Sequence, residues 1–218
     1  MAKVFIIGAA GKVGIHLTRQ LADNGHQVSA LHRKPEQADT LQQAGATPVA
    51  GDIQALSRDA LAALLTGHDA VIFTAGAGGA GIELTNAIDG AGLALAVDAA
   101  EAAKVRRFLL VSAFPDAGRG KTPSEGFENY MMRVKRQADV YLAASALDWT
   151  IVRPGTLTDE PARGLIHAGL AIPYGNIPRA DVAATLAALI DRPEVHHTII
   201  ELTEGDVPVA AALQSLPR

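Results

Sequence analysis

Short apolar segments alternate with segments in which apolar residues recur at helical spacing through most of the chain. The short segments predict β-strands at residues 3–8, 27–32, 47–50, 70–75, 107–112, 150–153 and 198–202. The segments of helical spacing predict α-helices at residues 12–24, 36–43, 58–65, 82–103, 128–145 and 181–190. Because strands alternate with helices, the pattern predicts an α/β fold in which helices cover both faces of a parallel sheet.

Right-handed crossovers between these strands predict the strand order 3-2-1-4-5-6, with residues 198–202 as an additional strand. This is a three-layer, doubly wound parallel sheet of the Rossmann type, which binds ligands where the strand order reverses. Residues 155–179 are rich in glycine and proline and break the alternation. We therefore expect a single domain over residues 1–218, with a small irregular substrate-side segment at about 155–180.

A glycine-rich turn joins the first predicted strand to the first helix. A dinucleotide site needs a tight turn, a close approach of the pyrophosphate and close helix–strand packing, and each demand favours glycine. The pyrophosphate would rest on the free N–H groups at the start of the helix. The alternative is a turn made of glycines for packing alone. The candidate cofactor-binding residues of this turn are Gly8, Ala10, Gly11, Lys12, Val13 and Gly14.

The end of the second predicted strand indicates which dinucleotide binds. Sites for NAD place an acidic residue there to bind the ribose 2′-hydroxyl, whereas this chain has His32, Arg33 and Lys34, with no acid before Glu36. A guanidinium can bind a 2′-phosphate through two hydrogen bonds. We therefore expect NADP as the cofactor, with Arg33 on the 2′-phosphate and Lys12 or Lys34 assisting. The alternative is a basic, solvated loop.

Other strand ends supply further candidates for the cofactor groove. Asp52 could accept a hydrogen bond from the adenine amino group, or be an ordinary turn residue, and Ile53 could cover a ring face. Ala75 and Gly76 are small residues of the kind found where backbone approaches a ligand. Pro154 is expected to shape the turn under the nicotinamide.

Together these residues resemble the short-chain dehydrogenase/reductase superfamily, and especially its atypical, NAD(P)-dependent epimerase/dehydratase-like (NAD(P)H-binding) branch. The resemblance extends over nearly the whole chain. It is carried by GAAGKVG (8–14), Arg33, GD (51–52), FTAG (73–76), RFLLVS (107–112), LDWTIVRPG (147–155) and RADVA (179–183).

The resemblance implies a catalytic serine after the fifth strand and a Tyr-x-x-x-Lys pair on the following helix. Ser112 and Lys135 match the serine and the lysine, and Lys135 would also hold the nicotinamide ribose. The tyrosine departs from the pattern, because Met131 stands four residues before Lys135 and Tyr130 stands five before it. On a regular helix Tyr130 would lie ~140° around from Lys135, although a helix start or a π-bulge could bring them together. The catalytic candidates are therefore Ser112, Tyr130 and Lys135.

Composition narrows the classes of function. The chain is 49% hydrophobic, has a net charge of −4 and contains no cysteine. It has no basic stripe for nucleic acid, no signal-peptide core and no apolar run long enough to span a membrane, so we expect a cytoplasmic protein. No histidines have the helical spacing of a zinc site, and on a strand the rings of His196 and His197 would point to opposite faces. We therefore expect no metal site.

These observations predict an NADP-binding oxidoreductase, or an epimerase/dehydratase-like enzyme, that acts on a small carbonyl, quinone or flavin-like substrate. The alternative is an NADP(H)-binding sensor or regulatory protein without turnover, because the cofactor half of the pattern is intact while its catalytic half is altered. The expected partner is a small-molecule substrate, and the chain is expected to be a monomer or a homodimer.

Overall fold

The computed structural model describes residues 1–114, 117, 122 and 124–216. The strands are β1 (Lys3–Ile7), β2 (Gln27–His32), β3 (Thr47–Ala50), β4 (Ala70–Phe73), β5 (Arg107–Val111), β6 (Asp148–Pro154), β7 (Thr156–Thr158), β8 (Leu165–Gly169), β9 (Asn176–Pro178), β10 (Thr198–Glu204) and β11 (Val207–Pro208). The α-helices are α1 (Lys12–Asp23), α2 (Gln37–Gln43), α3 (Arg58–Leu65), α4 (Ile82–Thr85), α5 (Leu93–Ala102), α6 (Glu125–Glu128), α7 (Arg136–Ala143), α8 (Arg179–Ile190) and α9 (Val209–Gln214). Two segments are π-helical, η1 (Asn86–Gly92) and η2 (Asn129–Lys135).

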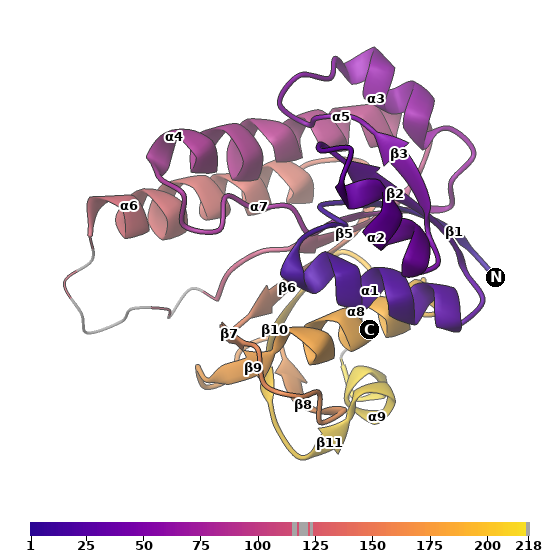
Figure 1. Cartoon of the computed structure of the whole chain (residues 1–218). Helices are drawn as coiled ribbons and strands as arrows, with labels where there is room; N and C mark the ends of the chain where they lie inside the picture. The colour runs from indigo at the N-terminus through magenta and orange to yellow at the C-terminus, as the bar shows by residue number, and fades with distance from the viewer. Residues whose placement is uncertain (115–116, 118–121, 123, 217–218) are drawn as a thin grey trace.

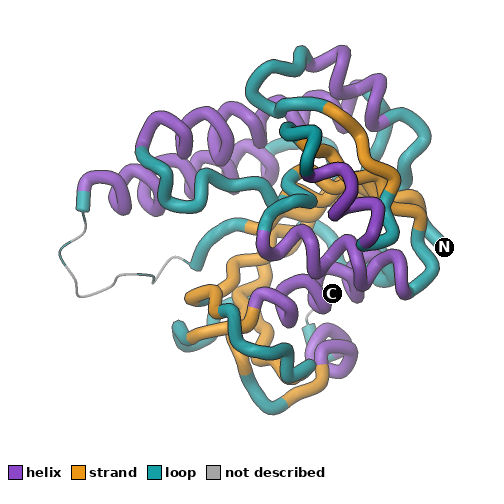
Figure 2. Tube along the Cα trace, in the orientation of Figure 1, coloured by secondary structure: helices purple, strands orange, loops and turns teal. Residues whose placement is uncertain are grey.

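The main sheet has the order β3-β2-β1-β4-β5-β6-β10-β8-β11. The sheet is parallel throughout the run β3-β2-β1-β4-β5-β6-β10. Strand β8, by contrast, is antiparallel to both β10 and β11. The predicted order 3-2-1-4-5-6 is therefore confirmed, and the additional strand predicted at 198–202 is β10, beside β6. Figures 1 and 2 show the strands gathered between the helices.

Successive side chains of a strand point to opposite faces of the sheet, and a hydrophobic core covers each face. Val4 and Ile6 belong to the cluster of buried residues that α1 and α8 complete, whereas Phe5 and Ile7 belong to the cluster that α3, α5 and α7 complete. All four side chains are at most 1% exposed. A strand with both faces buried reads as a continuous apolar run, which is why VFII after Lys3 is so clear a strand signal.

Residues 155–179 are more regular than the sequence predicted. β7 pairs with β9 in a separate two-stranded parallel sheet, and β8 joins the main sheet beside β10. Pairing with β8 satisfies backbone groups of β10 that an edge strand would leave open. The prediction of irregular structure was wrong because the glycines and prolines of this segment stand between and beside short strands.

The predicted helices at 82–103 and 128–145 are also less regular than expected. Each is continuous but contains a π-helical stretch, η1 in the first and η2 in the second. The two helices pack side by side through η1 and η2 and through α5 and α7 (Figure 1). A π-helix bonds residues five apart, so it changes which side chains share a face.

The switch point between β1 and β4 requires glycine at position 8. Gly8 has a φ of +95°, and a Cβ there would lie 2.3 Å from the Ala75 nitrogen. A Cβ on Gly14 would lie 2.2 Å from the Gly8 carbonyl oxygen, so α1 packs directly on the turn. The protein's own packing therefore explains both glycines.

No helix in the described ranges combines the length and the apolar character needed to cross a membrane.

Replacing Gly8 with alanine is expected to destabilise the chain far more than replacing Gly25. Both glycines have a positive φ, but a Cβ on Gly25 meets nothing within 4 Å. Gly25→Ala should therefore cost about 1 kcal/mol through backbone conformation alone, and Gly8→Ala about 3 kcal/mol or more through the added backbone clash. Urea unfolding measures both. Equal losses would contradict the close approach of Gly8 to Ala75.

Candidate functional site

The candidate residues gather along one edge of the main sheet. Parallel strands end at the same edge of the sheet, and each of the first six strands has one candidate at that end. In strand order from β1 to β6, these are the glycine-rich turn, Arg33, Asp52, Ala75, Ser112 and Pro154. The turn after β1 and the loop after β4 are neighbours, because Ile7 pairs in register with Phe73 and the Thr74 hydroxyl donates to the Gly8 carbonyl at 3.1 Å. The edge therefore carries both expected halves of the site, the cofactor groove and the catalytic residues.

The surroundings of Gly11 show whether the turn has room for a phosphate group. Gly11 caps the start of α1 without a side-chain hydrogen bond, so helix geometry leaves the first N–H groups without an intrahelical acceptor. A Cβ on Gly11 would meet only the Gly8 carbonyl oxygen, at 3.2 Å, and both Ala10 and Gly11 are exposed. A side chain at position 11 would therefore crowd only one backbone oxygen, and the exposed start of α1 has the form that a pyrophosphate-binding turn requires.

Arg33 lies just beyond β2 with an exposed side chain that forms no ion pair with the described residues. The Gln37 side-chain oxygen accepts hydrogen bonds from the backbone N–H groups of Arg33 and Lys34, at 3.2 and 3.0 Å. The backbone at this strand end is therefore held while both side chains stay open to a ligand. A free guanidinium on a held backbone suits a 2′-phosphate.

Lys12, by contrast, is already paired. Its Nζ lies 2.7 Å from Asp159 Oδ2, and Arg179 Nη1 lies 2.7 Å from Asp159 Oδ1. The hydrogen bond from Lys12 lowers the pKa of Asp159 below its usual value, and Arg179 adds to this effect. The carboxylate thus links the glycine-rich turn to the segment between β7 and α8. No local pattern of residues predicts this contact, since the partners are far apart along the chain.

The remaining groove candidates have more ordinary surroundings. Asp52 Oδ1 accepts from the Gln54 N–H at 3.0 Å, which is the contact of a turn aspartate. Ile53 is 9% exposed and packs against η1, where a Cβ on Gly92 would approach it to 3.3 Å. Gly76 is exposed, and Pro154 is buried at the end of β6. Asp52 keeps its second carboxylate oxygen for another donor.

The π-helix η2 brings Tyr130 and Lys135 together. Residues five apart share a face of a π-helix, and the Lys135 Nζ lies 5.5 Å from the centroid of the Tyr130 ring. Lys135 Nζ also donates to the Val111 carbonyl at 3.4 Å, next to Ser112. The five-residue spacing that departs from the family pattern is therefore compatible with a Tyr–Lys pair in this backbone.

Asp89 of η1 completes this cluster. Its Oδ1 lies 2.8 Å from Lys135 Nζ, and its Oδ2 accepts from the Ala77 N–H at 2.9 Å. The side chains of Asp89 and Lys135 are only 1% and 8% exposed. The ion pair thus ties the loop after β4 to the two π-helical segments.

The charges of this cluster set its acid–base character. Burial raises the pKa of Tyr130, the Lys135 charge opposes this rise, and the carboxylates of Asp89 and Asp139 reinforce it. Burial would lower the pKa of Lys135, but the charge of Tyr130 in its ionised form and the carboxylates of Asp89 and Asp139 outweigh burial and raise that pKa. Lys135 is therefore a cation and Tyr130 a neutral phenol at physiological pH. A neutral phenol can donate a proton but is not prepared to remove one.

Ser112 is buried beside a second carboxylate. Neither its Oγ nor Asp139 Oδ1 reaches full hydrogen-bond geometry within the described part of the chain, but the hydroxyl lies close enough to the carboxylate to stabilise its charge. Asp139 Oδ2 accepts from Arg153 Nε at 3.0 Å and Nη2 at 2.8 Å. Burial raises the pKa of Asp139, although Ser112 and Arg153 oppose the rise. The sequence analysis missed Asp139, which stands four residues after Lys135 and so lies on its helical face.

Comparisons with known proteins cover nearly the whole chain. The profile of the family described as NAD(P)H-binding matches residues 8–193. The Bacillus subtilis (strain 168) protein named "Uncharacterized sugar epimerase YhfK" is 41% identical over 98% of this chain and 100% of its own length. The solved structure of a Bacillus halodurans protein, provisionally named an NAD-dependent epimerase/dehydratase, has a TM-score of 0.89 and 32% identity, over 98% of this chain and 100% of that one. ChuY, an anaerobillin reductase from Escherichia coli O157:H7, has a TM-score of 0.77 and 27% identity, over 94% of this chain and 98% of that one.

Removing the charge of Asp89 is expected to destabilise the protein unless Lys135 is neutralised as well. Asp89→Asn keeps an oxygen for the Ala77 N–H but leaves Lys135 buried without its counterion, which should cost about 3 kcal/mol. The double variant with Lys135→Met removes both charges and should recover most of that loss. Urea unfolding of the single and double variants measures the difference.

Asp59→Asn is the control for this experiment. Asp59 pairs with Arg58 at an exposed position, with 82% and 60% of their side chains accessible, and such pairs contribute less than about 1 kcal/mol. If Asp89→Asn is no more harmful than Asp59→Asn, the buried ion pair does not stabilise the site.

Proposed function

Because the chain belongs to the NAD(P)H-binding family, we propose that it is an NADPH-dependent oxidoreductase that reduces a small carbonyl, quinone or flavin-like compound. A nicotinamide supplies hydride chemistry when it is bound. The groups of the chain itself must then hold the cofactor, orient the substrate and supply the proton.

The observation that carries this proposal is the pairing of Tyr130 with Lys135 on η2. Lys135 Nζ lies 5.5 Å from the Tyr130 ring centroid and contacts the backbone beside Ser112. In the resemblance drawn from the sequence, serine, tyrosine and lysine act together at this place. Tyr130 then donates the proton to the substrate oxygen, Ser112 holds that oxygen, and Lys135 fixes the cofactor ribose.

The charges around Tyr130 bear on its role as a proton donor. Asp89 already neutralises Lys135, and the pKa of Tyr130 is raised rather than lowered. The hydroxyl keeps its proton and can pass it to a substrate oxygen during reduction, but the raised pKa makes it a weaker acid than a tyrosine beside an unpaired lysine. The reductase name of ChuY also points to reduction.

Arg33 supports NADPH rather than NADH. The chain has no acidic residue at the end of β2 to bind a ribose 2′-hydroxyl, and the Arg33 guanidinium is exposed without an ion-pair partner among the described residues. A phosphate can accept two hydrogen bonds from one guanidinium. The cofactor preference therefore rests on a side chain that the fold leaves open.

A cofactor-binding sensor is the second candidate. It is favoured by Asp89, because a lysine whose charge is neutralised lowers the pKa of a neighbouring tyrosine less than a free lysine does. Such a protein would bind NADPH through the same groove and release it unchanged. Turnover separates the two candidates.

Replacing Arg33 with glutamine is expected to weaken NADPH binding by about tenfold or more and to leave NADH binding nearly unchanged, because only NADPH carries the 2′-phosphate. Isothermal titration with both cofactors measures the two affinities. Arg19→Gln on α1 removes the same charge from another exposed arginine and should change neither affinity. Equal losses for both cofactors in Arg33→Gln would sink the assignment of the 2′-phosphate.

NADPH oxidation with a panel of aldehydes, quinones, flavins and linear tetrapyrroles tests the reaction itself. Where turnover is found, Tyr130→Phe should lower kcat by about 100-fold or more, because it removes the proton donor, and should leave the affinity for NADPH unchanged. Tyr141→Phe, at a tyrosine that is 43% exposed on α7, is the matched control. Tight NADPH binding without turnover on any substrate would favour the sensor, and full activity of Tyr130→Phe would remove Tyr130 from the mechanism.

A further inference from the structure

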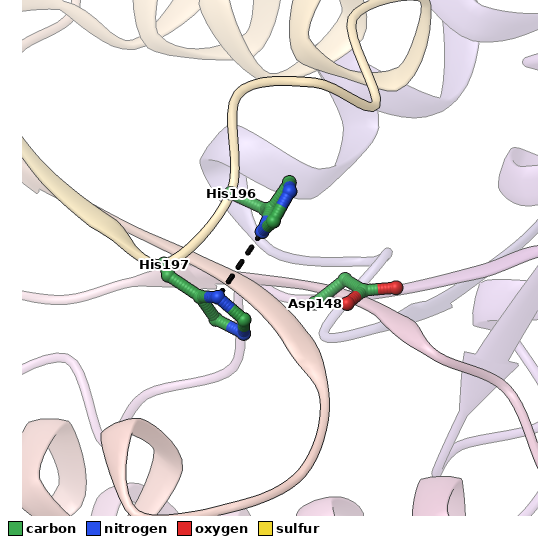
Figure 3. Close-up of side chains that lie close together, drawn as sticks. All are labelled: Asp148, His196 and His197. Atoms are coloured by element: carbon green, nitrogen blue, oxygen red, sulfur yellow. Dashed lines mark hydrogen bonds between the residues drawn. The ribbon is translucent and has the colours of Figure 1, made fainter. Parts of the chain in front are cut away.

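A second cluster of ligating side chains lies at the opposite edge of the sheet from the cofactor groove. Asp148 opens β6, and His196 and His197 directly precede β10, which pairs with β6 in parallel. One oxygen or nitrogen atom from each of these residues lies within 4.8 Å of the others (Figure 3). We propose that Asp148, His196 and His197 bind a divalent transition-metal ion, with Zn²⁺ as the first candidate.

The backbone at His197 makes this arrangement possible. The sequence analysis expected the two rings on opposite faces of a strand, and that expectation is wrong because β10 begins only at Thr198. His197 has a φ of +51°, in the left-handed region that residues with a Cβ rarely adopt. This turn brings the rings of His196 and His197 to within 4.6 Å of each other, measured between centroids. A strained backbone that converges two imidazoles is the kind of geometry found at functional sites.

The spacing of the ring nitrogens fits a tetrahedral metal ion. Nδ1 of His196 and Nδ1 of His197 are 3.2 Å apart and share the hydrogen bond drawn as the dashed line of Figure 3, so a metal ion would take the place of its proton. Two nitrogens that each lie ~2.0–2.1 Å from a zinc ion at a tetrahedral angle are about 3.3 Å apart. The two histidines therefore stand at the separation that a zinc ion requires.

A hydrogen bond to a backbone carbonyl determines the tautomer of His197. Its Nε2 lies 3.0 Å from the Leu147 carbonyl oxygen, which can only accept a hydrogen bond, so Nε2 carries the proton. In the neutral ring Nδ1 then accepts the 3.2 Å hydrogen bond from the His196 Nδ1–H, and it is available to a metal ion once His196 moves that proton to its other ring nitrogen. A histidine that binds a metal through one nitrogen typically donates its other N–H to a carbonyl or carboxylate in this way. His196 is exposed, so its Nε2 can hold a proton in solvent while its Nδ1 binds the ion.

Asp148 is the third ligand, and Arg106 is its present partner. Arg106 donates to both carboxylate oxygens, each at 2.9 Å, and its own side chain is 70% exposed. Each carboxylate oxygen has more than one lone pair, so a metal ion can bind one oxygen while Arg106 keeps its hydrogen bonds. His196 and His197 also line a cavity of about 210 Å³.

A bound ion would cross-link the starts of β6 and β10. Trp149, the only tryptophan of the chain, lies beside the cluster, with its ring centroid 5.6 Å from that of His197. Its fluorescence therefore reports on a paramagnetic ion at this place.

The test is a titration of full-length, tag-free and metal-stripped protein with Co²⁺, followed by displacement with Zn²⁺. We expect saturable binding, visible d–d absorption of a low-symmetry site, quenching of Trp149 fluorescence and a rise in Tm with Zn²⁺. His196→Ala and Asp148→Asn should each weaken binding by about tenfold or more, since even the outer partners of metal ligands are worth 10–100-fold. His197→Asn should do the same, and asparagine tolerates the left-handed backbone.

His167→Ala is the matched control, because His167 is an exposed histidine on β8 outside the cluster. Its affinity for Co²⁺ should equal that of the unchanged protein. Circular dichroism of the metal-free variants shows whether each one folds. The proposal is overturned if the protein binds no Co²⁺ saturably, or if His196→Ala and Asp148→Asn both bind Co²⁺ as tightly as the His167→Ala control.

Discussion

The buried ion pair between Asp89 and Lys135 holds together parts of the chain that are far apart in sequence. Asp89 also accepts a hydrogen bond from Ala77 in the loop after β4, and Lys135 also donates to Val111 at the end of β5. Two buried charges are tolerated only while they stay paired, because either one alone would lose its hydration without compensation. The long helices that carry these residues are therefore fixed in register at the edge of the sheet where the site lies.

The π-helical segments η1 and η2 carry the two residues of this ion pair. A π-helix is rarer than an α-helix and is often found at functional sites. Here η1 and η2 pack against each other, joined at the surface by a hydrogen bond of 3.1 Å between Asn129 and Asn86. In η2 the wider turn places Tyr130 beside Lys135, although five residues separate them. The π-helical turn of η2 thus positions Tyr130 and Lys135, the pair on which the proposed chemistry depends.

The sequence predicted the strand order and the glycine-rich turn because both leave local signals. Gly8 and Gly14 are required by contacts within a few residues or with the adjacent strand, and buried strands read as apolar runs. For the Tyr130–Lys135 pair the sequence left two alternatives open, a regular helix that separates the residues and a π-bulge that joins them, because no residue type specifies a π-helix. The contact of Asp159 with Lys12 and the meeting of His196 with His197 depend on long-range packing and on a single left-handed residue. Asp139 is different, since its four-residue spacing from Lys135 was readable in the sequence.

The pairing of charges along the edge of the sheet that carries the candidate site bears on the proposed preference for NADPH. Lys12 and Arg179 share Asp159, and Lys135 is held by Asp89. An incoming phosphate would have to compete with a carboxylate for each of these cations. Arg33 has no such competitor among the described residues, so a phosphate that reaches it gains the full benefit of the guanidinium. In the proposed site, selectivity for a 2′-phosphate would therefore depend as much on the acids that occupy the other cations as on the arginine itself.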